Sequence, residues 1–177
     1  DIKHFENFFA SFTIEQIGKE FDLIKLDKDK LVLNIELKSE DVGVDVIQNQ
    51  LEKNRYYLKH LASDVRLYTF VESTKELYKY TPKGVQIVEL DDLKDTMELF
   101  QKSMGENIES LFQANNYLIS PLNTPSKFMT GDYFLTNQQH DIKKKIVNLI
   151  LLNDREHILG ITGKAGTGKG IDACKIE

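Results

Sequence analysis

Three polar residues, an aspartate, a glutamate and a lysine, lie within two consecutive apolar segments and could together hold a metal ion. Asp22 lies in the segment 21–26, and Glu36 and Lys38 lie in the segment 31–38. Both segments have the composition of strands, and the polar residues between them predict a tight turn. In the resulting hairpin, residues whose numbers add to 58 face each other. Asp22 should therefore lie across from Glu36, with Cβ atoms about 5 Å apart.

The expected neighbours of these side chains favour a metal site. Two carboxylates that converge among apolar residues repel each other and resist ionisation. A divalent cation that prefers hard oxygen ligands, Mg²⁺ or Mn²⁺, removes this repulsion. Lys38 should share a face with Glu36, because side chains two apart in a strand point the same way, and its amine could orient water or stabilise charge on a phosphate. Alternatively, the three residues form a salt bridge on a solvated face, although Ile24 and Val32 would share that face.

A helix expected over residues 44–61 should carry a polar stripe and several basic residues. Gln50, Asn54 and Tyr57 are spaced four and three residues apart, so they form one polar stripe on this helix. The helix is also the most basic one of the N-terminal region, with Lys53, Arg55, Lys59 and His60. This charge fits contacts with a phosphate backbone.

Hydrophobic periodicity over the whole chain predicts a mixed α/β fold of the α+β type. Helices are expected over residues 5–19, 44–61, 91–102, 107–116 and 137–153. Strands are expected over residues 21–26, 31–38, 65–71, 76–80, 85–90 and 157–162. Asp91 and Asp92 should cap the third helix, and residues 120–126 should form a proline-containing linker. We expect a domain at 1–103, a connection at 104–132 and a second domain from 133 to 177.

The order of these elements, together with the acidic residues, resembles the PD-(D/E)XK nuclease superfamily over residues 5–90. Asp22 matches the aspartate of the family, and Glu36-Leu37-Lys38 matches its E-x-K motif, within an αββαβ core. The resemblance implies that Asp22 and Glu36 hold Mg²⁺ or Mn²⁺, that Lys38 acts on the attacking water or the phosphate, and that Gln50 supports the site. It implies hydrolysis of phosphodiester bonds, with DNA ahead of RNA as substrate. An inert nuclease-like module that binds nucleic acid or a partner is the alternative.

A phosphate-binding loop is predicted near the C-terminal end, where the sequence fits G-x-x-x-x-G-K after an apolar segment. Its residues include Gly163, Gly166, Thr167, Gly168 and Lys169. Glycines let backbone N–H groups converge on phosphate oxygens, and Lys169 would reach the outer phosphates. The next residue is Gly170, where the pattern has a Ser or Thr whose hydroxyl holds Mg²⁺. We therefore do not expect this chain to hydrolyse ATP.

Gln139 precedes this loop and, with Phe134-Leu135-Thr136, resembles the adenine-reading glutamine motif of superfamily 1 helicases. The resemblance implies ATP as the ligand of a full motor, of which this chain would carry only the start. The combined layout resembles bacterial nuclease–helicase proteins. Thr136 and Gln139 could also form a capping box at the start of a helix.

Composition restricts the partners of the chain. The net charge is −5, and the first 126 residues carry 15 basic and 22 acidic residues. A region this acidic is a poor ligand for nucleic acid by bulk charge, so a contact must be local or must recruit metal ions. The single cysteine excludes a disulfide framework and a cysteine-rich zinc site, and no apolar run approaches the roughly 20 residues of a membrane span. We expect a cytoplasmic protein without membrane contact, and the oligomeric state stays open, a homodimer included.

Overall fold

The computed structural model describes residues 6–15, 18–27, 29–100, 108–112, 124–130, 133, 135, 137–151, 160 and 162. Its strands are β1 (Phe9–Ile14), β2 (Lys19–Asp27), β3 (Asp29–Lys38), β4 (Ala62–Val71), β5 (Glu76–Thr81) and β6 (Gly84–Val88). Its helices are α1 (Val44–Leu58), α2 (Leu90–Glu98), α3 (Ile108–Leu111), α4 (Pro125–Met129) and α5 (Asn137–Leu151). The chain divides into two compact units, 1–116 and 117–177. The predicted domain limits at 103 and 133 stay predictions.

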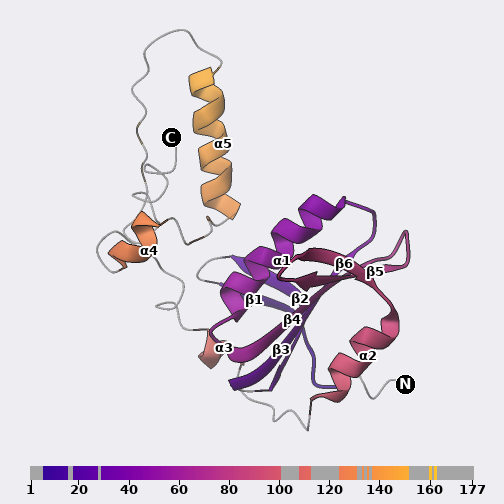
Figure 1. Cartoon of the computed structure of the whole chain (residues 1–177). Helices are drawn as coiled ribbons and strands as arrows, with labels where there is room; N and C mark the ends of the chain where they lie inside the picture. The colour runs from indigo at the N-terminus through magenta and orange to yellow at the C-terminus, as the bar shows by residue number, and fades with distance from the viewer. Residues whose placement is uncertain are drawn as a thin grey trace. The chain divides into compact units, whose positions relative to one another are not determined.

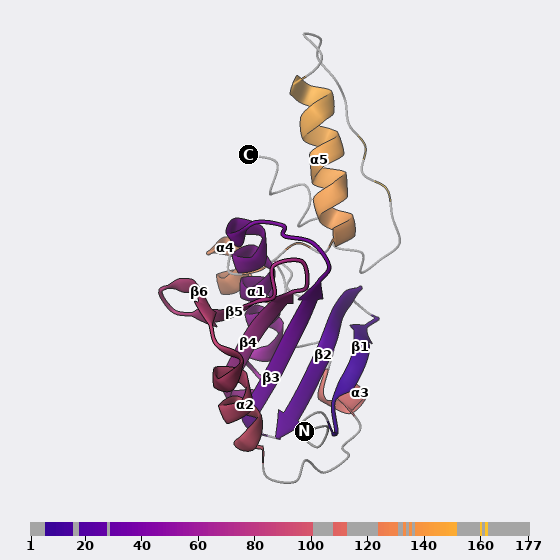
Figure 2. The same cartoon turned by 90° about the vertical axis from the view of Figure 1, so that its right-hand side faces the viewer.

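A mixed six-stranded sheet forms the centre of the first unit. The strands lie in the order β1-β2-β3-β4-β5-β6, and every neighbouring pair is antiparallel except β3 and β4, which run parallel. A parallel pair needs a crossover connection, and α1 provides it between β3 and β4. Figures 1 and 2 show α1 over one face of the sheet and α2 over the other. The first unit is thus a mixed α/β fold with a helix on each face.

The predicted helix at 5–19 is wrong, because residues 9–14 form the edge strand β1. β1 pairs with β2, with Phe12 opposite Phe21. The ring of Phe12 also lies 4.9 Å from that of Phe112, centroid to centroid, after α3. Pairing to β2 and this aromatic packing therefore outweigh the helical spacing of the phenylalanines, which are also good strand residues.

The face of the sheet under α1 combines apolar packing with a polar cluster. Ile47, Leu51 and Leu58 of α1 are fully buried. Alternation along β3 places Val32 on the same face as Asn34 and Glu36, and both of these polar residues bond to α1 side chains. Ile24 and Val32 are buried on this face, and Leu33 and Ile35 are buried on the other, so the hairpin is covered on both sides. α1 starts after Gly43, whose φ of 83° favours glycine.

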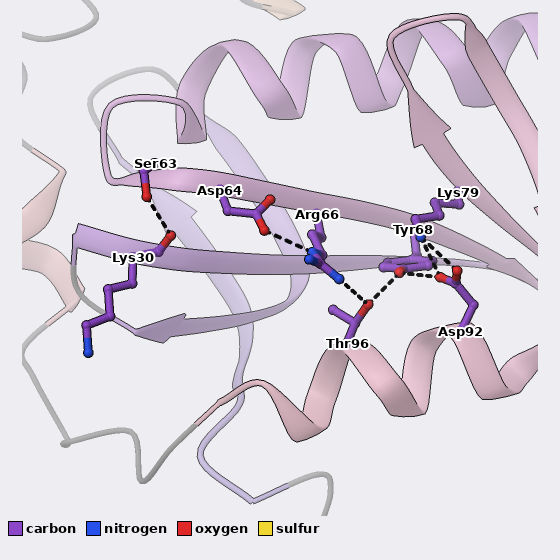
Figure 3. A network of polar contacts seen from close by, with 8 residues as sticks. All are labelled: Lys30, Ser63, Asp64, Arg66, Tyr68, Lys79, Asp92 and Thr96. Carbon is purple, nitrogen blue, oxygen red and sulfur yellow. Dashed lines mark hydrogen bonds and ion pairs between the residues drawn. The ribbon is translucent and has the colours of Figure 1, made fainter.

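The opposite face packs against α2 through an apolar cluster and a polar network. Leu33, Ile35, Tyr68 and Leu77 of the sheet pack with Leu93 and Met97 of α2. Beside them, the buried Tyr68 hydroxyl donates a hydrogen bond of 2.6 Å to Asp92 Oδ2, and Lys79 Nζ lies 2.8 Å from both carboxylate oxygens of Asp92 (Figure 3). Thr96 Oγ1 lies 2.8 Å from the Tyr68 hydroxyl and accepts a hydrogen bond from Arg66. This network fixes α2 on the sheet.

Several sequence predictions of the elements are confirmed and others need correction. The strands and helices predicted at 21–26, 31–38, 65–71, 76–80, 44–61 and 137–153 correspond to β2, β3, β4, β5, α1 and α5. Asp91 and Asp92 do not cap α2, because its N-cap is Glu89, without a side-chain cap, and both aspartates lie in the first turn. Of the predicted helix 107–116, the structure describes α3 and Phe112. Of the predicted strand 157–162, it describes Gly160 and Thr162, both exposed and outside any strand.

The second unit contains α4 and α5. The end of the predicted linker is helical, because Pro125 begins α4, at a position where its missing N–H is not needed. The rings of Phe128 and Tyr133 stack, with centroids 5.9 Å apart and planes at 6°. None of the helices in the described ranges has both the length and the apolar composition needed to cross a bilayer.

Candidate active site on the β2–β3 hairpin

The hairpin register brings Asp22 and Glu36 to the same place on the sheet. β2 and β3 pair with Leu23 opposite Ile35 and Lys25 opposite Leu33, which is the register expected from the sequence. The next pair along the ladder would be Asp22 and Glu36. Asp22 Oδ2 accepts a hydrogen bond of 2.8 Å from the backbone N–H of Leu37. The Asp22 carboxylate therefore lies against the backbone between Glu36 and Lys38.

The Glu36 carboxylate is buried and held by three amide groups. Glu36 is only 2% exposed. Oε1 accepts hydrogen bonds from Asn34 Nδ2 at 3.0 Å and from Asn54 Nδ2 at 2.8 Å, and Oε2 accepts one from Gln50 Nε2. Gln50 thus contacts Glu36 directly, and its predicted support of a catalytic site stays a prediction. A solvated-face arrangement does not apply to Glu36.

Two lysines of the hairpin strands, Lys19 and Lys38, belong to the same region as these carboxylates. Lys38 ends β3 and is half-buried, and among the described residues neither Asp22 nor Glu36 has an ion pair within 4.0 Å. Lys19, at the start of β2, lies close enough for their charges to act on it. Burial lowers the pKa of Lys19, the charges of Glu36 and Asp22 oppose this, and those of Lys38 and Lys53 add to it. The cross-strand salt bridge is therefore not formed.

The carboxylate oxygens of Asp22 and Glu36 suit a hard cation that takes only a few ligands from the protein. A carboxylate offers about four lone-pair positions, and three hydrogen bonds occupy those of Glu36 while one occupies those of Asp22. Acceptor capacity therefore remains on both. Within the described ranges, no group of three or more His, Cys, Asp or Glu residues is arranged to hold a metal. A cation here would have two carboxylates, and Mg²⁺ commonly completes such a shell with water and phosphate oxygens.

The sequence alone did not identify the contributions of Asn34, Asn54 and Lys19 to this site. Asn34 was not singled out, although an amide between Leu33 and Ile35 in a buried strand requires hydrogen-bond partners. Asn54 lies on the polar stripe of α1, but helical spacing alone does not reveal its contacts with Asn34 and Glu36. Tyr57, on the same stripe, is buried, and burial raises its pKa. Lys19 carried no sequence signal, because nothing in the pattern around it distinguishes it from a surface lysine.

The predicted nucleotide-binding residues lie largely outside the described part of the chain. Gly163, Gly166, Thr167, Gly168 and Lys169 all fall there. Gln139 is described, lies in the first turn of α5 and is half-buried. Its predicted part in reading adenine stays a prediction, as does the capping box with Thr136.

Comparisons of the chain with protein-family models, with curated proteins and with solved structures return no match.

Proposed function

We propose that the first unit is a metal-dependent nuclease whose active site contains Asp22, Glu36, Lys38 and Gln50. The observation that carries this proposal is the buried Glu36 carboxylate, held by Gln50 beside Asp22 in the expected hairpin register. Burial of a carboxylate costs free energy, and among the described residues no cationic side chain pairs with Glu36, so a bound metal ion would offset this cost. The resemblance to the PD-(D/E)XK superfamily in the order of residues along β2, β3 and α1 supports the same reading of the site.

Each residue has a distinct part in this scheme. Asp22 and Glu36 would hold Mg²⁺ or Mn²⁺, which activates water and offsets negative charge on a phosphate when it is bound. Gln50 holds Glu36 in place through its amide. Lys38 follows Glu36 by two residues on β3 and would stabilise the negative charge that develops on the phosphate during attack. Among the described residues, no carboxylate forms an ion pair with Lys38, so its amine would be available to a bound phosphate.

Nucleic acid is the substrate class that this charge arrangement favours, and the resemblance to the PD-(D/E)XK superfamily implies DNA ahead of RNA. The first 126 residues are acidic overall, so bulk attraction does not explain binding. Burial lowers the pKa of Lys19, and the charges of Lys38 and Lys53 act in the same direction, so both of these lysines lie near Lys19. This local positive charge, increased by a divalent cation, would hold phosphates at the site.

A cleavage assay tests the proposal. The purified chain should cut DNA in the presence of Mn²⁺, and Lys38→Ala should abolish cleavage while leaving DNA binding within a few-fold. Lys75→Ala is the matched control, because Lys75 is exposed and pairs only with Glu72 on a turn. Absence of cleavage of DNA and RNA by the wild type, together with absence of Mn²⁺ binding, would refute the proposal.

A second candidate is an inert module of the same fold that binds nucleic acid or a partner. The observation that favours it is that the amides of Asn34, Gln50 and Asn54 satisfy Glu36 without any cation. On this hypothesis, neither the wild type nor Lys38→Ala cleaves, and both bind equally.

The nucleotide loop supports a separate proposal for the C-terminal region. Its glycines and Lys169 would bind phosphates, and Gln139 would contact adenine in a complete motor of the superfamily 1 helicase type. Because Gly170 lacks the hydroxyl that holds Mg²⁺, ATP hydrolysis by this chain is not expected. An assay of phosphate release from ATP tests this expectation, and release by the wild-type chain would contradict it.

A further inference from the structure

We propose that Asn34 and Asn54 are positioning residues that hold the Glu36 carboxylate so that Oε2 alone presents a free position to a divalent cation. This inference rests on the proposed function, because it concerns how the same site is prepared for metal. Neither asparagine belongs to the E-x-K motif or to the glutamine position on the helix. Both come from elements that also supply a site residue, β3 and α1.

The two asparagines occupy one oxygen of Glu36 completely. Asn34 Nδ2 and Asn54 Nδ2 both donate to Oε1, at 3.0 and 2.8 Å. Because each carboxylate oxygen has about two lone-pair positions, Oε1 has no position left. Oε2 accepts one hydrogen bond, from Gln50. Its second position is therefore the one that Glu36 can offer to another ligand.

The amide of Asn54 can adopt only one orientation in this cluster. Its Nδ2 donates to both Asn34 Oδ1, at 2.7 Å, and Glu36 Oε1. A flipped amide would place its oxygen against these two oxygens, which is repulsive. The observed orientation costs free energy, because it leaves Asn54 Oδ1 buried without a hydrogen-bond partner among the described residues. The orientation is thus set by the need to donate to Asn34 and Glu36.

Asn34 connects this arrangement to the strand that carries Asp22. Its Nδ2 also donates to the backbone oxygen of Leu23, the residue after Asp22, at 3.0 Å. Asn34 and Asn54 are both fully buried, so water does not compete for these hydrogen bonds. One chain of contacts therefore runs from β2 through Asn34 to Glu36 and to α1, and it fixes the two carboxylates relative to each other.

The test combines a wild-type measurement with one variant. In the wild-type chain, titration with Mg²⁺ followed by NMR should shift the side-chain amide signals of Asn34, Asn54 and Gln50 together with the backbone amide of Leu37. The side-chain amide of Asn49, exposed on the same helix, is the internal control and should not move. In Asn54→Ala, Mn²⁺ affinity measured by calorimetry should fall about 10- to 100-fold, as for other residues that orient metal ligands. Asn49→Ala should bind as the wild type does.

The outcomes separate this inference from the proposed function. If Mg²⁺ shifts Leu37 but leaves the amides of Asn34 and Asn54 unchanged, or if folded Asn54→Ala binds Mn²⁺ as tightly as the wild type, the positioning role is refuted and the nuclease proposal stands. If Mg²⁺ shifts none of these signals, the metal site itself is refuted. Should Asn54→Ala fail to fold, the wild-type titration decides the question alone.

Discussion

Gln50 Nε2 on α1 donates a hydrogen bond to Glu36 Oε2 on β3, across a separation of 14 residues in the chain. This contact joins the crossover helix to the strand that carries the E-x-K segment. It turns a polar stripe on a helix and an acidic residue in a strand into one cluster. The proposed chemistry depends on this cluster, and each of its residues can be tested separately.

Replacement of Glu36 by glutamine should abolish cleavage while the fold is retained. In Glu36→Gln, the new side-chain oxygen can accept from Asn34 and Asn54, and its amide can donate to a flipped Gln50. We therefore expect the free energy of unfolding to fall by only about 1–2 kcal/mol, whereas Mn²⁺ binding is lost. Glu40→Gln, at an exposed position two residues beyond Lys38, should change neither property. Retained cleavage in Glu36→Gln would exclude Glu36 as a metal ligand.

Removal of the Gln50 amide should weaken metal binding and leave folding largely intact. Gln50→Ala frees Glu36 Oε2 to rotate away from the site, and we expect a 10- to 100-fold loss of Mn²⁺ affinity. Gln48→Ala is the matched control on the same helix, because Gln48 bonds Glu52 instead. Equal Mn²⁺ affinities of the two variants would show that the Gln50 contact has no part in the site.

The central hairpin could be predicted from the sequence because local rules determine it. A short polar turn between two apolar segments sets the register, and the pairing of Leu23 with Ile35 agrees with it. Helical spacing predicted the polar stripe that contains Gln50, whereas its place at the site was implied by the family resemblance. The contact to Glu36 also required the crossover of α1 between β3 and β4, which local patterns do not display.

The remaining elements depended on contacts that the sequence does not display. The spacing of Phe8, Phe9 and Phe12 is helical. β1 is nevertheless a strand, because it pairs with β2 and because the ring of Phe12 packs against that of Phe112. The role of Asn34 depends on a hydrogen bond from Asn54, which lies 20 residues away in the chain. Such partnerships are tertiary, so local propensity cannot reveal them.

The docking of α2 should depend on Asp92 and not on its neighbour Asp91. Asp92→Asn removes the charge that Lys79 and the Tyr68 hydroxyl contact, and we expect a loss of about 1–2 kcal/mol in the free energy of unfolding. Asp91→Asn is the matched control, because Asp91 is exposed and pairs only with Lys94, so its effect should stay within about 0.5 kcal/mol. Urea unfolding of both variants measures the difference, and equal losses would contradict this account.

The difference between wild type and Asp92→Asn should also depend on pH. Burial of Asp92 acts to raise its pKa, but the hydrogen bonds from Lys79 and Tyr68 outweigh it, so the pKa lies below the ordinary value of 3.8. A carboxyl group with a lowered folded-state pKa stabilises the fold above its unfolded pKa and loses this effect as the pH falls through the folded value. The difference in the free energy of unfolding between wild type and Asp92→Asn should therefore be constant near neutral pH. It should disappear as the pH falls below 3.8. A gap that persists in strong acid would contradict the assigned cause.

Lys19 should contribute to nucleic-acid affinity without being required for hydrolysis. It lies near both carboxylates, and its Nζ is 4.7 Å from the Phe21 ring centroid. If it contacts a phosphate, Lys19→Met should weaken DNA binding for all sequences and reduce the salt dependence of binding by about one ion. Lys83→Met, at an exposed turn position, is the control. If the affinity of Lys19→Met for DNA depends on salt concentration as strongly as that of the wild type, Lys19 does not contact a phosphate.

The most direct test of the metal site is a crystal of the chain soaked in Mn²⁺ and examined by anomalous scattering. We predict one peak on the β2–β3 hairpin, at roughly 2 Å from one oxygen of Asp22 and from Oε2 of Glu36. The peak should be absent in Glu36→Gln. A well-ordered hairpin that carries no anomalous peak at saturating Mn²⁺, with Glu36 still bonded to its three amides, would contradict the account.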